Sequence, residues 1–504
     1  MEEKSPLDFS VPQRQSSIAI GIILIKFIRT TIRAFWPILV SFFIGTRSSS
    51  SFEDFIGYIA IGFAAFNLIG SVLTYFRYYF HIEDNAMIID KGVLKRTHTN
   101  IPFDRIQTIN FKQNIIHQIF GVISVEIDTA GAGKSEISID ALKHEQAHAL
   151  RDFIMAEKQQ LEQEAAAEGT QVEEEPAQEY ERILHLNPTD LLKVGVSQNH
   201  LRSMGLIFAF VFTIINQVSD DWTGLVADGV EEYQGYLYES NAFIFAIMVI
   251  FVLVISFIFS LVTTVLKYFD LSLSINNHGL KIVRGLFNRE EISINKKKVQ
   301  IISWTENPIR RIFHLFTLQI EQASSAEASQ LKSKIKVPGS YIEQVSRVIT
   351  TVFPAEYYRD EPEFPVSKLL KYRLLFFIGI LPILVFGIPI YMEAGLDVLY
   401  TLLWLPVIWI LITQYHKRRS FELNEELLRN NSGILGYSHD LLQLHKVQAI
   451  RIKQSWYQRR KSIATVQLFT AAGHLSIPFI PLHQAQELEN YILYRVESDS
   501  REWM

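Results

Sequence analysis

The sequence predicts a multi-pass α-helical membrane protein with three soluble domains, each a small antiparallel β-barrel or sheet capped by a C-terminal helix. Hydrophobic residues make up 48% of the 504 residues while 20% are charged, so apolar membrane segments must alternate with soluble parts. Apolar runs of near-membrane length occur in three pairs. A stretch of similar size follows each pair, and the three stretches can be laid over one another.

The composition excludes several kinds of chemistry. There are no cysteines, which rules out disulfides, thiolate catalysis and cysteine-ligated metal sites. A net charge of −5 gives no reason to expect a nucleic-acid partner. Residues 1–17 are polar and lack a cleavable signal peptide, so we expect internal segments to provide membrane insertion.

The paired apolar runs are predicted to be membrane anchors. A basic amphipathic stretch that starts at Ile18 precedes the first pair. No run carries an acid or base at mid-membrane, which argues against a transporter or a proton relay. The predicted spans are 34–46 and 55–75, then 201–217 and 241–266, and finally 373–391 and 396–413.

The charges beside these spans predict their orientation. The loop within the second pair, 218–240, holds six acidic residues and no Lys or Arg. Basic residues instead flank the first span, at Lys26, Arg29 and Arg33, and follow the last one in "HKRR" (416–419). The positive-inside rule then places both termini and all large soluble segments in the cytoplasm.

A spacing pattern defines the repeat. In each soluble stretch a glycine is followed 15 residues later by a glutamine, and a basic residue stands two positions before that glutamine. The three sets are Gly92, Arg105 and Gln107; Gly285, Lys298 and Gln300; and Gly433, Lys446 and Gln448. Three matched intervals without a gap indicate a true internal repeat.

Each repeat is predicted to be mostly β. Alternating residues around the glycine favour a hairpin, and a second period-2 run, a short amphipathic piece and two more strands follow. A helical stretch closes each repeat, at 143–160, 339–353 and 483–497. The segment 158–183 is rich in glutamate and poor in large apolar residues, so it is interpreted as a solvated linker.

The runs "IPFDRIQTI" (101–109) and "QIFGVISVEIDTAG" (118–131), together with the pattern at Gly92, resemble the bacterial pleckstrin-homology-like (PH-like) membrane proteins of the YdbS/YdbT type. The resemblance covers about 70–495 and implies two transmembrane helices followed by one PH-like domain, three times over. The fold class it implies is a multi-pass α-helical membrane protein with three cytoplasmic PH-like domains. The expected parts are an amphipathic stretch and transmembrane pair at 18–75, PH-like domain 1 at 76–157, the acidic linker at 158–183, transmembrane pair 2 at 201–266, PH-like domain 2 at 267–355, transmembrane pair 3 at 373–413 and PH-like domain 3 at 414–497.

The segment "HEQAH" (144–148) matches the zinc-protease pattern H-E-x-x-H. On a helix, His144 and His148 would share a face and could bind Zn²⁺, with Glu145 as the general base. A membrane zinc metalloprotease is therefore the alternative function.

Two observations make this motif a decoy. Helical periodicity counted from Leu142 turns both histidines away from the apolar face. The predicted apolar face comprises Leu142, Gln146, Ala149, Leu150, Phe153 and Ile154. The other repeats carry Ile342, Glu343 and Ser346, and Leu482, His483 and Gln486, at the same positions. We therefore expect no catalytic residue, no metal site and no cofactor, while a regulatory metal on the histidine pair remains open.

Four basic clusters are candidate contacts for anionic lipid or for a partner. Each charge near a membrane surface contributes about 1 kcal/mol. The other interpretation is that they are solvated faces and positive-inside determinants. The pieces 303–314 and 454–461 are typical of places where a helix meets a membrane surface or a neighbouring domain. The clusters are Lys95 and Arg96; Lys296, Lys297 and Lys298; Arg310 and Arg311; and Arg459, Arg460 and Lys461.

These features predict a non-enzymatic membrane-anchored scaffold in a bacterial inner (plasma) membrane. Its PH-like domains would bind each other, a partner membrane protein or anionic lipid, since tethered modules gain avidity. The expected partners are membrane lipids and either further copies of the chain, as a homo-oligomer, or another membrane protein, and the expected process is envelope maintenance or defence. Movement of a lipid between leaflets is a weaker alternative, because it would need polar lining within the apolar helices.

Overall fold

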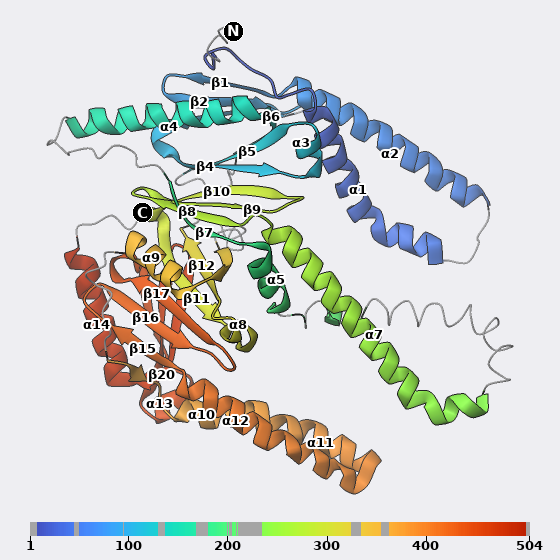
Figure 1. Cartoon of the computed structure of the whole chain (residues 1–504), viewed down its shortest axis with the longest axis vertical. Helices are drawn as coiled ribbons and strands as arrows, with labels where there is room; N and C mark the ends of the chain where they lie inside the picture. The colour runs from blue at the N-terminus through green and yellow to red at the C-terminus, as the bar shows by residue number, and fades with distance from the viewer. Residues whose placement is uncertain are drawn as a thin grey trace.

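A computed structural model of the chain shows a stack of β-sheets from which helices project (Figure 1). The described residues form four antiparallel sheets, two of seven strands and two of three. The structure describes residues 8–44, 50–93, 95–129, 137–167, 180–198, 200, 204–207, 209, 234–323, 334–353 and 362–499.

The first repeat, here unit 1, begins with two helices and builds two sheet layers. A β-bridge joins Gln13 to Phe80, so the N-terminal segment covers the outer edge of the first strand. The elements are α1 (Ala19–Ile44), α2 (Ser50–Phe76), β1 (Tyr79–Glu83), β2 (Ala86–Lys91), β3 (Thr97–Pro102), the 3₁₀ turn η1 (Phe103–Arg105), β4 (Ile106–Gln113), α3 (Ile115–Ile119), β5 (Val122–Thr129), β6 (Ile137–Lys143) and α4 (His144–Ala167).

Unit 2 has the same order of strands and adds an edge strand, β7, before its helices α5 and α7. Its elements are β7 (Glu181–His185), α5 (Pro188–Val196), α7 (Gln234–Tyr268), β8 (Ser272–Asn276), β9 (Gly279–Arg284), β10 (Arg289–Asn295), the 3₁₀ turn η2 (Lys296–Lys298), β11 (Val299–Glu306), α8 (Pro308–Ile312), β12 (Phe316–Gln322), β13 (Lys334–Ser340) and α9 (Ile342–Val352).

Unit 3 repeats this plan, and the helices that precede its main strands are interrupted by a π-helical and a 3₁₀ segment. Its elements are β14 (Phe364–Pro365), α10 (Leu369–Leu374), the π-helix η5 (Leu375–Ile380), α11 (Leu381–Ala394), the 3₁₀ helix η6 (Gly395–Leu403), α12 (Trp404–Lys417), β15 (Ser420–Leu423), β16 (Leu427–Ser432), β17 (Tyr437–Gln443), the 3₁₀ turn η7 (Leu444–Lys446), β18 (Ala449–Lys453), α13 (Trp456–Arg460), β19 (Ile463–Thr470), β20 (Gly473–Pro481) and α14 (Leu482–Ser498).

The repeated glycines are explained by one turn. Gly92, Gly285 and Gly433 all have positive φ angles, of 114°, 99° and 144°. A Cβ at Gly285 would lie 2.0 Å from the carbonyl oxygen of Asn288, which no side chain tolerates. The hairpin between the second and third strand of each unit therefore requires glycine at this position.

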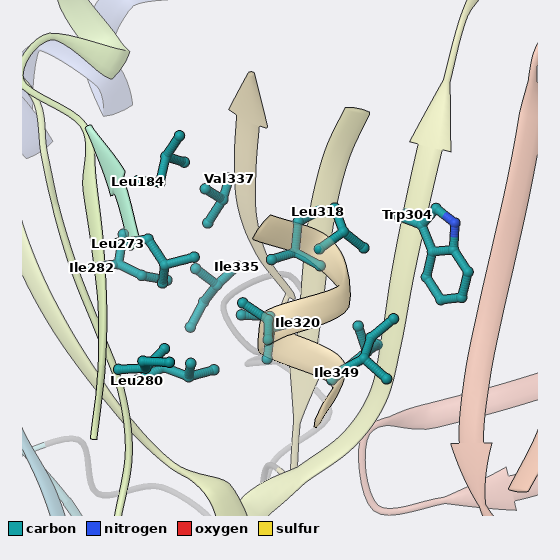
Figure 2. Close-up of a cluster of buried hydrophobic side chains, with 14 of the residues drawn as sticks. Leu184, Leu273, Leu280, Ile282, Trp304, Leu318, Ile320, Ile335, Val337 and Ile349 are labelled. Atoms are coloured by element: carbon teal, nitrogen blue, oxygen red, sulfur yellow. The ribbon is translucent and has the colours of Figure 1, made fainter. Parts of the chain in front are cut away.

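Each unit has its own core, which lies between its two sheets and its closing helix. In unit 2, Leu273, Leu280 and Ile282 of the first sheet face the second sheet. Ile335 and Val337 approach them from the second sheet, with Ile349 of α9 closing the cluster (Figure 2). Burial of such aliphatic side chains contributes about 1.5–3 kcal/mol each.

The sheets do not stop at the boundaries between units. One seven-stranded sheet has the order β6-β5-β4-β10-β9-β8-β7 and joins unit 1 to unit 2. The other has the order β13-β12-β11-β17-β16-β15-β14 and joins unit 2 to unit 3. The three units therefore form one stack of hydrogen-bonded strands.

The predicted fold class, a multi-pass α-helical membrane protein, is wrong. Four sheets organise the described part of the chain, and within it only Val249–Tyr268 and Leu369–Gly387 are apolar and long enough to cross a membrane. Hydropathy alone gave too many membrane spans, for two reasons. The first turns of α1 pack Ala19, Ile22 and Ile23 against β-strands. The last predicted span is divided between η6 and α12. Most of the predicted span 201–217 lies outside the described residues.

Candidate binding surfaces

Unit 1 joins unit 2 by antiparallel pairing of β4 with β10. The register sets Phe111 opposite Glu291 and Lys112 opposite Glu290. Side-chain contacts reinforce it: the guanidinium of Arg151 on α4 lies 2.9 Å from the carboxylate of Glu291. The Ser293 backbone N–H donates to Asn110 Oδ1 at 2.9 Å. This junction therefore combines main-chain and charged contacts.

Unit 2 joins unit 3 by the same pairing, now of β11 with β17. Trp304 lies opposite His439 and Thr305 opposite Ser438. The repeat glutamines Gln107, Gln300 and Gln448 set offsets of 193 and 148 residues between units. With these offsets Trp304 corresponds to Phe111 and His439 to Glu291, so both junctions use one register.

The basic residue of the repeat pattern pins each unit to the one before it. Lys298 Nζ lies 2.6 Å from Asp128 Oδ2 of unit 1, and the Lys298 side chain is only 4% exposed. Lys446 Nζ donates to the carbonyl oxygens of Lys297 (3.0 Å) and Val299 (2.5 Å) of unit 2. Arg105 has no preceding unit and is exposed. Burial lowers the pKa of Lys298, and the Asp128 carboxylate partly offsets this.

A half-buried histidine lies at the second junction. The His439 ring stacks on Trp304 at 5.1 Å between ring centroids, and its Nδ1 lies 2.7 Å from Asn431 Oδ1. Burial, with a smaller effect from the charge of Arg429, lowers the pKa of His439 to about 4. The neutral imidazole is thus the form that fits this interface.

Acid is therefore expected to weaken the second junction. The folded pKa lies below the ordinary value of 6.5, so the folded chain binds fewer protons and stability is lost as pH falls from 6.5 toward 4. The loss should reach about 3 kcal/mol, at 1.36 kcal/mol per pKa unit. His439→Gln should remove most of this pH dependence in thermal unfolding of the detergent-extracted chain. An unchanged acid slope in the variant would refute the assignment.

The ends of the sheets that meet the projecting helices α1, α2, α7 and α10 to α12 carry exposed apolar side chains. Gly285 N–H donates to Phe269 O at 2.8 Å and Leu286 N–H to Leu266 O at 3.0 Å, so the hairpin tip of unit 2 lies against the end of α7. The short helices α3, α8 and α13 follow strands that run back toward this end. The exposed apolar residues in these turns and helices are Ile115, Ile119, Phe120, Leu286, Phe287, Ile309, Ile312, Ile434, Leu435 and Trp456.

Most of the predicted basic residues lie beside this apolar surface. The Arg460 guanidinium sits 3.9 Å from the centroid of the Trp456 ring, and Arg311 lies 5.6 Å from that of Tyr437. Basic groups around exposed aromatic and aliphatic side chains suit an anionic membrane surface. The exposed basic residues of this surface, here called the membrane-end surface, are Lys95, Arg96, Arg311, Arg459, Arg460 and Lys461.

The remaining predicted residues are placed elsewhere. β10 leads away from the hairpin tip, so Lys296 and Lys297 in η2 lie about 20 Å from the membrane end at 3.3 Å per residue. Arg310 is buried and donates to Ser197 Oγ at 3.2 Å and to Thr317 Oγ1, which fastens α8 to the end of α5. Burial of Lys298 and Arg310 leaves little of either side chain for a lipid.

Comparison with known proteins agrees with this repeated architecture. Residues 20–158, 210–355 and 374–496 each match the bacterial PH domain, and together they cover most of the chain. The chain belongs to the bacterial PH domain family. It is 25% identical over 470 residues to the UPF0699 transmembrane protein YdbT of Bacillus subtilis (strain 168), a match that covers 91% of this chain and 92% of that protein.

The family assignment confirms the resemblance read from the repeats. Unit 1, unit 2 and unit 3 are bacterial PH units, and each matched segment takes in helices that precede the sheets. Together with the apolar segments Val249–Tyr268 and Leu369–Gly387, the likeness to a transmembrane protein indicates membrane association.

The histidine pair of unit 1 stays at the start of α4. His144 and Glu145 are exposed, and the His144 and His148 rings lie 4.5 Å apart. His148 is half-buried, and its ring centroid lies 4.7 Å from that of Phe111. Burial, then the charge of Arg151, lowers the pKa of His148. The ring therefore packs near the junction with unit 2 instead of turning wholly to water.

The predicted apolar face of this helix was partly wrong. Leu142 belongs to β6, so counting a helical period from it misplaces the phase. Ala147, and not Gln146, is buried with Leu150 and Ile154, while Phe153 is 40% exposed.

Sequence reasoning missed one group with metal-binding geometry. Ligand atoms of Glu426, His445 and Asp499 lie within 4.8 Å of one another in unit 3. They line a hollow of about 300 Å³ that Glu425 and Arg495 also line. Arg495 lies 3.8 Å from the Glu426 carboxylate. The residues are far apart in sequence, so no spacing pattern marks them.

Proposed function

We propose that the chain is a non-enzymatic, membrane-anchored scaffold whose PH units bind anionic lipid and protein partners at the cytoplasmic membrane surface. One observation carries this proposal: the long helices that precede the sheets in each unit, α1 and α2, α7, and α10 to α12, extend from the same side of the stack of sheets (Figure 1). Domains held this way have a high effective concentration at a surface, which raises their overall affinity for ligands on that surface.

The charge distribution supports lipid as one ligand. The exposed arginines Arg311, Arg459 and Arg460 lie in or beside the short helices of the membrane end. The cytoplasmic leaflet is negatively charged and attracts such groups by about 1 kcal/mol per residue. Basic residues beside the apolar helices also favour the cytoplasmic side for the PH units.

Reversing these charges should release anionic lipid. The triple variant Arg311→Glu, Arg459→Glu and Arg460→Glu is expected to lose most of its bound phosphatidylglycerol, measured by native mass spectrometry after release from mixed phosphatidylglycerol and phosphatidylethanolamine nanodiscs. The matched control reverses the exposed Lys297 at the far end of the sheets and should retain the lipid. Equal retention by both variants would remove lipid binding from the proposal.

The non-enzymatic part of the proposal has its own test. Glu145→Gln removes the only residue that the H-E-x-x-H motif offers as a general base. Cells that carry this variant should behave as wild type under ethanol and under membrane-active peptides, where a deletion strain should grow poorly. A variant that fails like the deletion would favour the metalloprotease alternative, and a deletion without effect would remove the envelope role.

A further inference from the structure

The first and last sheets of the stack each have an outer strand whose counterparts inside the chain are paired. β3 is the outer strand of the first three-stranded sheet, and β18 is the outer strand of the last. Within the described ranges, no strand hydrogen-bonds to the outer edge of either one. Exposed edges of this kind are templates for pairing with another chain.

These two edges are the counterparts of the strands that form the internal junctions. In repeat positions, β3 corresponds to β10 and β17, while β18 corresponds to β4 and β11. Each internal junction pairs one strand of each class, antiparallel and in one register. The free ends of the stack therefore carry the two halves of a third junction.

The side chains of β18 fit that role. Ile452 occupies the position of Phe111 and Trp304, the apolar residue at the centre of both internal junctions. Its neighbours Ala449 and Arg451 are exposed, whereas the corresponding part of β11 is buried. Phe111 and Trp304 are buried, whereas Ile452 is half-buried against the core of unit 3, so part of this apolar position stays accessible at the end of the stack.

The side chains of β3 fit it as well. His98 occupies the position of His439, and Asp90 occupies that of Asn431. His98 Nδ1 lies 2.7 Å from Asp90 Oδ1, and His439 Nδ1 lies 2.7 Å from Asn431 Oδ1. The His98 side chain is 62% exposed. The contact between His439 and Asn431 therefore has a counterpart at β3, between His98 and Asp90. In unit 3 the strand β11 lies against this position, whereas no described strand lies against it at β3.

Arg105 occupies the position of the basic residue that joins one unit to the preceding one. Its counterparts Lys298 and Lys446 both reach into the preceding unit, but Arg105 is exposed. In unit 3 the counterparts of the carbonyls that hold Lys446 are those of His445 and Val447 in and beside η7.

The surroundings of the η7 turn favour binding of a cationic side chain. The hollow beside it is lined by three carboxylates and one arginine, so it carries net negative charge. Its charged lining residues are Glu425, Glu426, Asp499 and Arg495.

We propose that β18 of one copy of the chain pairs antiparallel with β3 of a second copy, with Ile452 opposite His98 and Arg105 placed against η7. This inference rests on the proposed function for the view that the PH units work by binding, and deepens it by naming a second copy as partner. Pairing of two different surfaces makes a head-to-tail assembly, which grows into a ring or a row. Because the helices that precede the sheets project to one side in all three units, added copies can meet the same membrane (Figure 1).

The lysine at the end of β18 is compatible with this pairing. Lys453 on an edge strand is a common guard against association. Lys112 occupies the same position in β4, which is paired with β10, and there it lies opposite Glu290. A lysine at this position is therefore compatible with a formed junction.

Cysteine cross-linking tests the register, and the natural chain has no cysteine to interfere. Residues directly opposite in an antiparallel pair have Cα atoms about 4.5–5.5 Å apart, within disulfide range. The full chain carrying both His98→Cys and Ile452→Cys should give a ladder of disulfide-linked species in native membranes, at multiples of 58.1 kDa. The control His98→Cys with Lys453→Cys, one residue out of register, should link at least about tenfold less.

Mixing single variants tests the head-to-tail geometry. Membranes in which chains with His98→Cys are co-expressed with chains with Ile452→Cys should stop at the dimer, while either variant alone should stay monomeric. Dimers from His98→Cys alone would show a symmetric contact and overturn the proposal. An adduct whose mass is not a multiple of the chain's would show another protein at the edge, and would overturn it too. The positive control is the chain with Phe111→Cys and Glu291→Cys, which should form a disulfide within the chain. If this control links and the mixed variants give no product, the proposal is overturned.

Variants of Arg105 separate assembly from folding and from the proposed function. Arg105→Glu should lower the cross-linked fraction about tenfold, because it places a carboxylate against an acidic turn. Arg105→Lys should keep it, since lysine serves in both internal junctions. Lipid retention should be unchanged in both. If the chain with His98→Cys, Ile452→Cys and an intact Arg105 retains lipid but does not cross-link, this inference alone is refuted. Equal cross-linking in Arg105→Glu and Arg105→Lys would refute the placement of Arg105.

Discussion

Asp128→Asn is expected to destabilise the chain by about 3 kcal/mol at neutral pH, because it leaves the buried Lys298 charge without a counter-charge. Thermal unfolding of the detergent-extracted chain should show a midpoint about 3 °C lower, because the unfolding entropy of a chain this long is large. The effect should be large because Lys298 joins two units, so the core contacts of the junction weaken with it.

The pH dependence of this variant identifies the cause. Burial already holds the pKa of Lys298 below its ordinary 10.5, and removal of the Asp128 carboxylate lowers it further. The penalty for burying the charged form is fully present below the folded pKa and vanishes once the amine is neutral. The difference between variant and wild type should therefore shrink as pH rises toward 10.5.

A second substitution gives the control. Lys298→Met in the Asp128→Asn background removes the buried charge and should restore most of the stability, since apolar replacements of buried pairs are often neutral. If the double variant is as unstable as Asp128→Asn, the buried charge is not the cause.

Trp304→Ala should disrupt the junction between units 2 and 3, at a cost of about 3–5 kcal/mol for a buried tryptophan. Trp304 is 4% exposed and covers the His439 ring. Its loss opens a cavity where β11 meets β17, so the two units should unfold in separate thermal transitions. A single transition at the wild-type temperature would contradict this account.

The titration of His439 in the same variant gives an independent measurement. Water admitted beside the ring should raise its pKa from about 4 toward 6.5, as followed by NMR of a histidine-labelled chain. Trp304→Phe is the matched control, because it keeps a ring against the histidine and should hold the pKa low. A low pKa in Trp304→Ala would mean that the desolvation comes from other neighbours.

The membrane-end surface shows how far pattern reading extends into function. Basic clusters were found by composition, and Arg311, Arg459 and Arg460 are indeed exposed. Arg310 is buried although its neighbour Arg311 is exposed, and Lys298 is buried although its neighbour Lys297 is exposed. Consecutive positions in a turn or short helix face different directions. Adjacent residues of like charge can therefore have unrelated environments.

The H-E-x-x-H motif shows the reverse case. The letters match a zinc site, yet the first histidine begins the helix and is exposed. A motif carries chemistry only where the fold supplies a shielded cleft and further ligands.

The sequence by itself determined the repeat, the strands within it and the residues that mark its turns. Gly92, Gly285 and Gly433 are required by a local backbone conformation, and such requirements are written in a few neighbouring residues. The tertiary structure alone decided that the sheets run across the units and that Lys298 and Lys446 each bind the preceding unit. It also decided that β3 and β18 each have one edge without a partner strand in the described part of the chain. The contacts between units join residues more than a hundred positions apart, so no local sequence pattern encodes them. The pairing of strand edges depends on which surfaces folding brings together.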